Sequence, residues 1–248
     1  MTETDSPPPS RQQLAAMERQ LQLLTDAVVH DLRAPLRSID AFVARVATSA
    51  QARLEPDECA QLQRVREAAS RMTDLLAALS DWSHAGRAPL KAGPVDLSLL
   101  AEWAIADLRE AHPGRAVEST VQPGMTVLGD ERLLRRLLDH LLSNAWQFAQ
   151  PDAPVRVEVA GQYTPGHLHL RVRDHGMGFD PRYAHKLFEP LQRLHGPQDG
   201  ARHGLGLATA LTIAQRHGGG ITAVSRPGDG AEFTVDLPQA DSPGASDA

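Results

Sequence analysis

The chain has 248 residues, of which 42% are hydrophobic and only 4% aromatic, and its formal net charge is −6. So few aromatic side chains favour aliphatic helix packing and α/β layers over an aromatic-rich β-sandwich. The mild negative net charge does not indicate nucleic acid or an anionic membrane as a partner, and a local basic site stays open. The single cysteine, Cys59, cannot form an internal disulfide, so we expect a reducing, cytoplasmic location.

The two ends of the chain, residues 1–10 and 239–248, have the composition of disordered tails. The first ten residues, MTETDSPPPS, are acidic and proline-rich, whereas a signal peptide is basic and then apolar. No run of about 18 apolar residues occurs in the sequence. We therefore expect a soluble protein that does not insert into a membrane.

The first expected helix begins after the proline run, where Ser10 and Gln13 have the spacing of a capping box. Apolar residues then recur in steps of three and four, which predicts a coiled-coil seam: Leu14, Met17, Leu21, Leu24, Val28, Leu32, Pro35, Ile39, Phe42 and Val46. Two successive steps of four form a stutter around His30, and Pro35 removes a helical hydrogen bond from the Asp31 carbonyl, so a bend is predicted there. His30 lies about 200° round the helix from Val28 and should face solvent.

A second helix is predicted over residues 56–82, with a seam of its own at Leu62, Val65, Ala69, Met72, Leu76 and Leu79. The two helices predict a hairpin over residues 11–86. Because one hairpin has too little core alone, we expect two copies to form a dimeric four-helix bundle. The Gly- and Pro-bearing stretch HAGRAPLKAGP, residues 84–94, marks the domain boundary, with the linker placed at 87–94.

The second domain is expected over residues 95–238. Helical patterns occur at 99–108 and 130–148, and alternating or β-branched stretches predict strands at 155–159, 167–172, 221–224 and 232–237. This order predicts an α/β sandwich with a mixed sheet, and the chain as a whole is expected to be α+β.

Four short stretches carry the candidate chemistry: HDLRAPL at His30, LLSNAWQF at Leu141, RDHGMGF at Arg173 and HGLGLATA at His203. An exposed imidazole such as that of His30 is nucleophilic at neutral pH, and the neighbouring Asp31 can accept its other ring proton. Taken alone, the pair also fits a solvated helix surface without function.

The other three stretches are compatible with a nucleotide site. Asn144 could offer its amide oxygen to Mg²⁺, or could be a surface polar residue. Asp174 follows a strand and precedes two glycines, which suits either a ligand-binding carboxylate or a plain tight turn. Gly204 and Gly206 precede an apolar helical run, where free N–H groups could meet phosphate.

In this order, the stretches resemble the two-domain catalytic core of sensor histidine kinases of two-component systems. HDLRAPLRSIDAF and LLSNAWQFAQ are most similar to the kinase modules attached to bacterial phytochromes. The resemblance covers roughly residues 11–238. It implies a dimerisation and histidine-phosphotransfer bundle, followed by an ATP-binding domain of the gyrase, chaperone and kinase type.

The resemblance also implies roles for individual residues. His30 would be the phosphoacceptor and Asp31 its general base, Asn144 would bind Mg²⁺, and Asp174 would take the adenine amino group. The implied nucleotide contacts further include Gln147, Phe148, Gly176, Gly178, Phe188, Arg193, Gly204, Leu205 and Gly206.

The implied function is an ATP- and Mg²⁺-dependent, homodimeric protein-histidine kinase. It would autophosphorylate His30 and pass the phosphoryl group to an aspartate of a response-regulator receiver domain, with input from a separate upstream sensor protein. The alternative is a degenerate, non-catalytic adaptor or phosphotransfer protein that binds ATP weakly. A nucleotide-hydrolysing machine of the wider ATPase superfamily ranks last, because it leaves the His30 hairpin without a role.

Several positions depart from the family's pattern. Near the phosphates, His140 replaces an Asn, Gln147 a Lys and Arg202 the first glycine of G-x-G-x-G. Gln147 carries no charge, so a phosphate contact there loses about 1 kcal/mol. Three interpretations stay open. The site has decayed, Arg202 or Arg193 supplies the missing positive charge, or the changes are sequence drift in the solvated lid, the segment that covers ATP in this family.

Two further departures concern the lid and the bundle. Leu191 stands where the family's lid often has a second Phe. Ala34 lies four residues after the histidine, where many relatives carry a Thr or Asn tied to regulator dephosphorylation. Phosphatase activity is therefore left open by the sequence.

Overall fold

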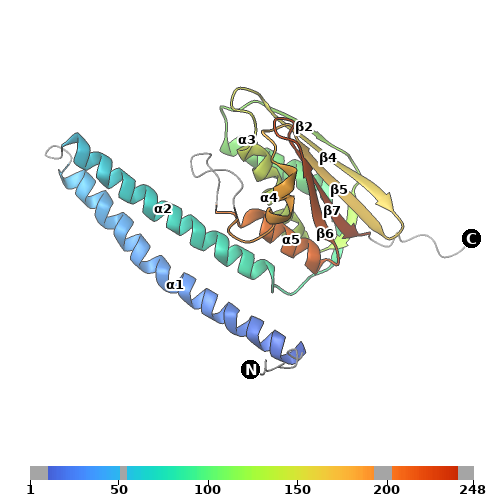
Figure 1. The fold of residues 1–248 in the computed structure, drawn as a ribbon, viewed down its shortest axis with the longest axis horizontal. Coiled ribbons are helices and arrows are strands. Elements are labelled where there is room, and N and C mark those ends of the chain that lie inside the picture. Colours follow the sequence, from blue (N-terminus) through green and yellow to red (C-terminus); the bar gives the residue numbers. More distant parts are fainter. Residues whose placement is uncertain (1–10, 51–54, 193–202, 240–248) are drawn as a thin grey trace, which may run out of the picture. The chain divides into compact units, whose positions relative to one another are not determined.

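The computed structural model describes residues 11–50, 55–192 and 203–239. The expectations for Arg193, Arg202 and residues 1–10 and 240–248 lie outside these ranges. The chain divides into two compact units, Met1–Ser83 and His84–Ala248, whose elements are drawn in Figure 1. None of the helices within the described ranges has the length and hydropathy needed to cross a membrane.

The first unit is a hairpin of two long helices, α1 (Arg11–Ala50) and α2 (Pro56–Ala85) (Figure 1). Its core consists of Val29 and Leu36 from α1, packed with Ala69 and Leu76 from α2. Helix α1 continues without interruption through Pro35. Helix α2 runs three residues past the predicted end, so it includes part of the stretch expected to start the boundary.

The predicted α1 seam is not the face that packs on α2. Five of the seam residues, which we call the α1 stripe, are 40–58% exposed: Val28, Leu32, Ile39, Phe42 and Val46. The buried residues Val29, Leu36 and Val43 lie on a neighbouring face of the same helix. Helix α1 carries a broad apolar surface, and periodicity alone does not tell which part of it meets α2. The α1 stripe is thus left uncovered within one chain.

The second unit consists of helices packed on a mixed sheet (Figure 1). The helices are α3 (Leu97–Ala111), α4 (Glu131–Gln147), the short 3₁₀ helix η1 (Pro181–Lys186) and α5 (Gly206–Arg216). The strands are β1 (Gly93–Asp96), β2 (Val117–Val121), β3 (Thr126–Gly129), β4 (Val155–Thr164), β5 (His167–Asp174), β6 (Gly220–Ser225) and β7 (Ala231–Pro238). The sequence patterns did not predict β1, β2, β3 or η1.

The main sheet has the strand order β2-β4-β5-β7-β6, in which β2 is parallel to β4 and the remaining neighbours are antiparallel. Strands β1 and β3 form a separate antiparallel pair. The predicted α+β fold with a mixed sheet is therefore confirmed.

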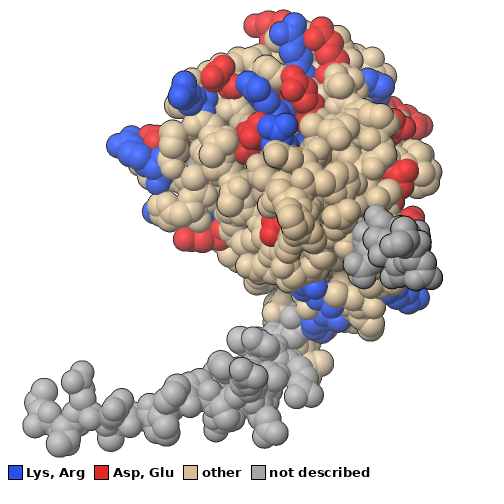
Figure 2. Space-filling model, turned by 90° about the vertical axis from the view of Figure 1, so that its right-hand side faces the viewer, with Lys and Arg blue, Asp and Glu red and all other residues tan. Residues whose placement is uncertain are grey.

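Helices α3, α4 and α5 cover one face of this sheet (Figure 1). Side chains alternate along β5: Leu168, Leu170 and Val172 are buried in the core, while His169 and Arg171 point to the other face. On the side turned to the viewer in Figure 2, Lys and Arg are interleaved with Asp and Glu. No single-sign patch of the kind that attracts nucleic acid is visible on the described residues of that side.

Candidate nucleotide-binding site

Asp174, the last residue of β5, is the buried acidic centre of the candidate site, with 5% of its surface exposed. Its Oδ1 accepts hydrogen bonds from the backbone amides of Gly176 (2.9 Å) and Ala231 (3.2 Å). Burial raises the pKa of Asp174, and these two amides oppose the rise only in part. Within the described residues, Oδ2 has no hydrogen-bond partner. The carboxylate is therefore held at one oxygen and open to a donor at the other.

The loop after Asp174 is attached to the end of α4. The Met177 amide donates to the Phe148 carbonyl at 2.8 Å, and Gln150 Nε2 donates to the Gly176 carbonyl at 3.3 Å. A Cβ added to Gly176 would collide with the Phe148 carbonyl oxygen. Only glycine allows this approach, and it brings the Asp174 loop next to the helix that carries Asn144.

Helix α4 (Glu131–Gln147) is flanked by the N-cap Asp130 and the C-cap Phe148, within a residue of the prediction at each end. Its buried leucines belong to the core of the second unit, and Asn144 lies on the last turn, where the Phe148 amide donates to its carbonyl at 3.1 Å. In the part of the chain that the structure describes, the Asn144 side-chain amide makes no hydrogen bond. It is half-buried and available to a ligand.

The start of α5 lies against α4. Leu205 is buried and stands at the N-cap position without a side-chain capping bond, so the first N–H groups of α5 have no side-chain acceptor there. A Cβ on Gly206 would lie 3.3 Å from Nδ1 of His140, one turn before Asn144. Gly204 has a φ of +69° and accepts a hydrogen bond from the Leu191 amide at 2.9 Å. An uncapped helix N-terminus thus sits beside the α4 face that carries Asn144.

The remaining expected nucleotide contacts fall around this centre. Gly178 has a φ of +65° and lies against the Arg226 carbonyl, while Phe188 is half-buried against the core. Gln147 and Phe148 lie at the end of α4 and at its C-cap. The geometry therefore brings Asn144, Asp174 and the glycines together in one unit. Arg193 lies outside the described residues.

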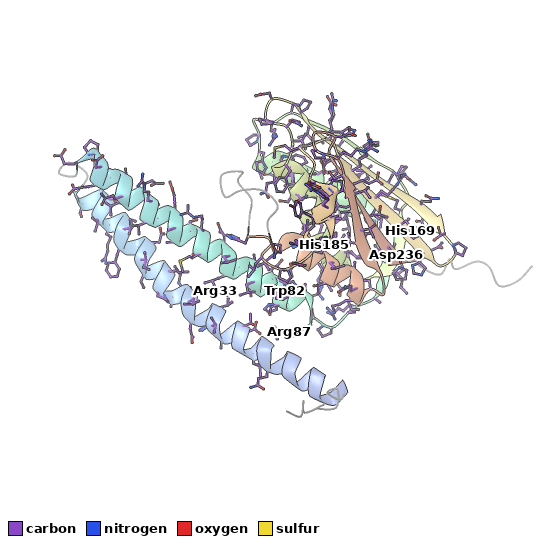
Figure 3. The ribbon with its side chains drawn as sticks, viewed as in Figure 1. Arg33, Trp82, Arg87, His169, His185 and Asp236 are labelled. Carbon is purple, nitrogen blue, oxygen red and sulfur yellow. The ribbon has the colours of Figure 1, made fainter. Side chains whose placement is uncertain are left out.

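His30 and Asp31 belong to the first unit. The side chain of His30 is 86% exposed, as the helical phase predicted, and its Nδ1 lies 3.3 Å from Asp31 Oδ1. Figure 3 labels Arg33, three residues further along the same helix. A carboxylate that accepts a hydrogen bond from Nδ1–H favours the tautomer with the proton on Nδ1. In that tautomer, Nε2 keeps its lone pair and faces water.

Three groups that shape the site were not found from the sequence. The Ala231 amide binds Asp174, and the Ser225 hydroxyl accepts from the Phe179 amide at 2.9 Å. Arg115 donates to carbonyls in the last turn of α4 and just beyond it: Trp146 (3.2 Å), Ala149 (3.3 Å) and Gln150 (3.0 Å). No local motif marks these residues, because each acts across the fold. Only the register of β6 on β7, with Ser225 opposite Ala231, could have indicated the first two.

Comparison with known proteins identifies the class of the second unit. Residues 129–241 match the family model described as histidine kinase-, DNA gyrase B- and HSP90-like ATPase. The solved structure of full-length ShkA in complex with AMPPNP shares the fold, with a TM-score of 0.65 and 23% identity, covering 89% of this chain and 47% of that one.

The sequence relatives narrow the class. Sensor histidine kinase TrcS of Mycobacterium tuberculosis is 33% identical over 226 residues, which is 89% of this chain and 44% of TrcS. Cyanobacterial phytochrome A of Nostoc is 26% identical over 209 residues, 84% of this chain and 27% of the phytochrome. Together with the family model, these relatives support a histidine kinase catalytic core in this chain. The chain spans less than half the length of these two relatives.

Proposed function

We propose that the chain is an ATP-dependent protein-histidine kinase that autophosphorylates His30 and passes the phosphoryl group to an aspartate of a response-regulator receiver domain. The observation that carries the proposal is His30 itself. Its imidazole is almost fully exposed, and Asp31 lies within reach of Nδ1. The ATPase fold alone is shared with gyrases and chaperones, whereas an exposed nucleophilic histidine on a helical hairpin is what a histidine kinase requires.

The second unit would supply the nucleotide. Asp174 Oδ2 would accept the adenine amino group, and the uncapped start of α5 at Gly206 would face the phosphates. Mg²⁺ would neutralise charge on the phosphate oxygens. The Asn144 amide oxygen suits this hard cation, and no cluster of three or more His, Cys, Asp or Glu occurs in the described ranges. Such an ion would depend on Asn144, phosphate and water.

In the proposed reaction, Nε2 of His30 attacks the γ-phosphorus, and the bond from that phosphorus to the β–γ bridging oxygen breaks. ADP leaves with the electron pair of that bond. The proton on Nδ1 stays hydrogen-bonded to Asp31, which stabilises the positive charge that develops on the ring. The carboxylate of the receiver aspartate would then attack the phosphorus and regenerate the imidazole.

A homodimer formed through the hairpin is part of the proposal. The α1 stripe is exposed within one chain, although its five residues are large and apolar. Burying the stripe against a second hairpin would complete a four-helix bundle. Input would come from a sensor protein or from further chain segments.

Incubation with ATP labelled at the γ-phosphate tests the kinase reaction. We expect acid-labile label in the wild type and in His84→Gln, an exposed histidine outside the hairpin core, and no label in His30→Gln. A wild type that takes up no label with either Mg²⁺ or Mn²⁺ would overturn the proposal.

A degenerate adaptor is the second candidate, favoured by His140 beside Gly206 and by the uncharged Gln147. It predicts negligible affinity of the full chain for Mg-ATP, together with retained binding or phosphotransfer at His30. Calorimetric titration with Mg-ADP separates the two, because a kinase requires measurable binding.

A further inference from the structure

The predicted linker lies at the start of the second unit and is fastened to the rest of that unit, although its Gly and Pro content predicts a loose segment. Arg216 Nη1 donates to the carbonyl of Ala85 at 2.8 Å, and Nη2 donates to that of Ala88 at 2.6 Å. Three residues further on, the Lys91 amide donates to Asp130 Oδ2 at 2.8 Å. Ala85, the last residue of α2, is fully buried. Residues 85–91 are therefore held at both ends.

The chemistry of these contacts makes them strong. The last carbonyls of a helix have no partner inside the helix, and Arg216 satisfies one of them with a charged donor. Its planar fork reaches two carbonyls at once, which an ammonium group cannot match. Asp130 is almost completely buried. Burial alone would raise its pKa, but the amide of Lys91, the Arg132 guanidinium and the amide of Leu133 lower it, so the carboxylate stays charged.

Arg216 and Asp130, the two residues that hold the linker, are connected to each other and to the candidate nucleotide site. His217, next to Arg216, accepts the Asp130 amide at Nε2 (3.0 Å) and contacts the Ile213 carbonyl through Nδ1 (2.8 Å). Arg216 ends α5, the helix that begins at Gly206, and Asp130 caps α4, the helix that carries Asn144. The linker is thus bonded to the far ends of both helices that form the candidate site.

We propose that Arg216 and Asp130 clamp residues 85–91 onto the second unit, and that Arg216 is a positioning residue for phosphoryl transfer. The Gly/Pro stretch then belongs to the second unit, and the division between the two units falls between Ser83 and His84, inside α2. Figure 3 labels Trp82 and Arg87, which flank this division along the chain. The clamp shortens the free tether, which raises the effective concentration of bound ATP at the histidine. This second part rests on the proposed function.

Hydrogen–deuterium exchange on the full chain tests the clamp without any need for kinase activity. Arg216→Gln should speed exchange of the amides of Arg87, Ala88 and Lys91 at least tenfold, and Arg216→Lys should give an intermediate value. The control is Arg109→Gln, which removes a side-chain bond to Ser119 Oγ of 2.9 Å in the same unit. Exchange in residues 167–174 of the sheet should not change. If Arg216→Gln left residues 87–91 at wild-type rates, the clamp would be refuted.

Steady-state autophosphorylation tests the positioning role. Arg216→Gln should lower kcat about fivefold because the tether lengthens, while the KM for ATP and the affinity for Mg-ADP stay at wild-type values. Arg216→Lys should recover part of the rate. Faster exchange with an unchanged kcat would refute the positioning role of Arg216 but would still support the clamp. A wild type without kinase activity would refute the proposed function, and the exchange result would still decide the clamp.

Discussion

Replacing Asp174 by asparagine separates ligand binding from folding at the candidate site. The asparagine oxygen can still accept the amides of Gly176 and Ala231, so the loop should keep its path. In the proposed site, the other side-chain atom becomes an NH₂ donor where the adenine amino group, which is also a donor, would lie. Loss of a hydrogen bond to a charged acceptor costs about 2–3 kcal/mol, or about 30- to 150-fold in the dissociation constant of Mg-ADP.

The same substitution should not reduce stability. Burial raises the pKa of Asp174, so its contribution to stability is full at low pH and is lost as pH rises through the folded-state pKa. The asparagine side chain has no charge to bury, and we expect an equal or higher Tm for Asp174→Asn at pH 7. Titration calorimetry with Mg-ADP and thermal unfolding without nucleotide measure the two effects. Asp229→Asn, an exposed loop substitution, is the control. Nucleotide affinity within threefold of wild type would refute the assigned role of Asp174.

Three further predictions concern assembly and stability. Phe42→Glu places a charge in the exposed α1 stripe and should convert the proposed dimer to a monomer in light scattering at micromolar concentration. A wild type and a variant of equal mass would contradict dimerisation through this stripe. Gly230→Ala should lower the unfolding free energy in urea by about 2 kcal/mol or more, because φ is +79° and the new Cβ would meet the Asp174 carbonyl; a loss below about 0.5 kcal/mol would argue against this packing. Because the fold lowers the pKa of Asp130, the charged carboxylate stabilises the folded protein above about pH 4. This contribution is lost as pH falls through the folded-state pKa. Asp130→Asn should therefore destabilise at pH 7 and differ less from wild type at pH 3, and an equal difference at both pH values would contradict the linkage.

Features set by local sequence were predictable, and features set by pairing were not. Helix α4 was placed to within a residue, because Asp130 is a good N-cap and the leucines repeat with helical period. Strand β2 was missed because it is a half-buried edge strand whose partner, β4, comes much later in the chain. Residues 56–82 similarly predicted a helix, but not the additional turn that ends at Ala85.

The candidate site shows the same division. Asp174 and Gly176 were predicted because they lie in one short stretch that resembles a known family. The Ala231 amide that shares Asp174 Oδ1 was not, because it depends on how β6 and β7 pair. Likewise, apolar periodicity identified the α1 stripe as an apolar surface but could not tell that α2 packs against the neighbouring one, which contains Val29 and Leu36.

The parallel pairing of β2 with β4 has a consequence for how the second unit folds. A parallel pair cannot be closed by a tight turn, and here the crossover contains β3 and the whole of α4. Strand β2 can join the sheet only after that long connection has closed, which is a slow, non-local step. The helix carrying Asn144 is therefore inside the connection that completes the sheet. During folding, nucleotide should stabilise only late species, and a refolding rate measured with and without Mg-ADP should show little acceleration.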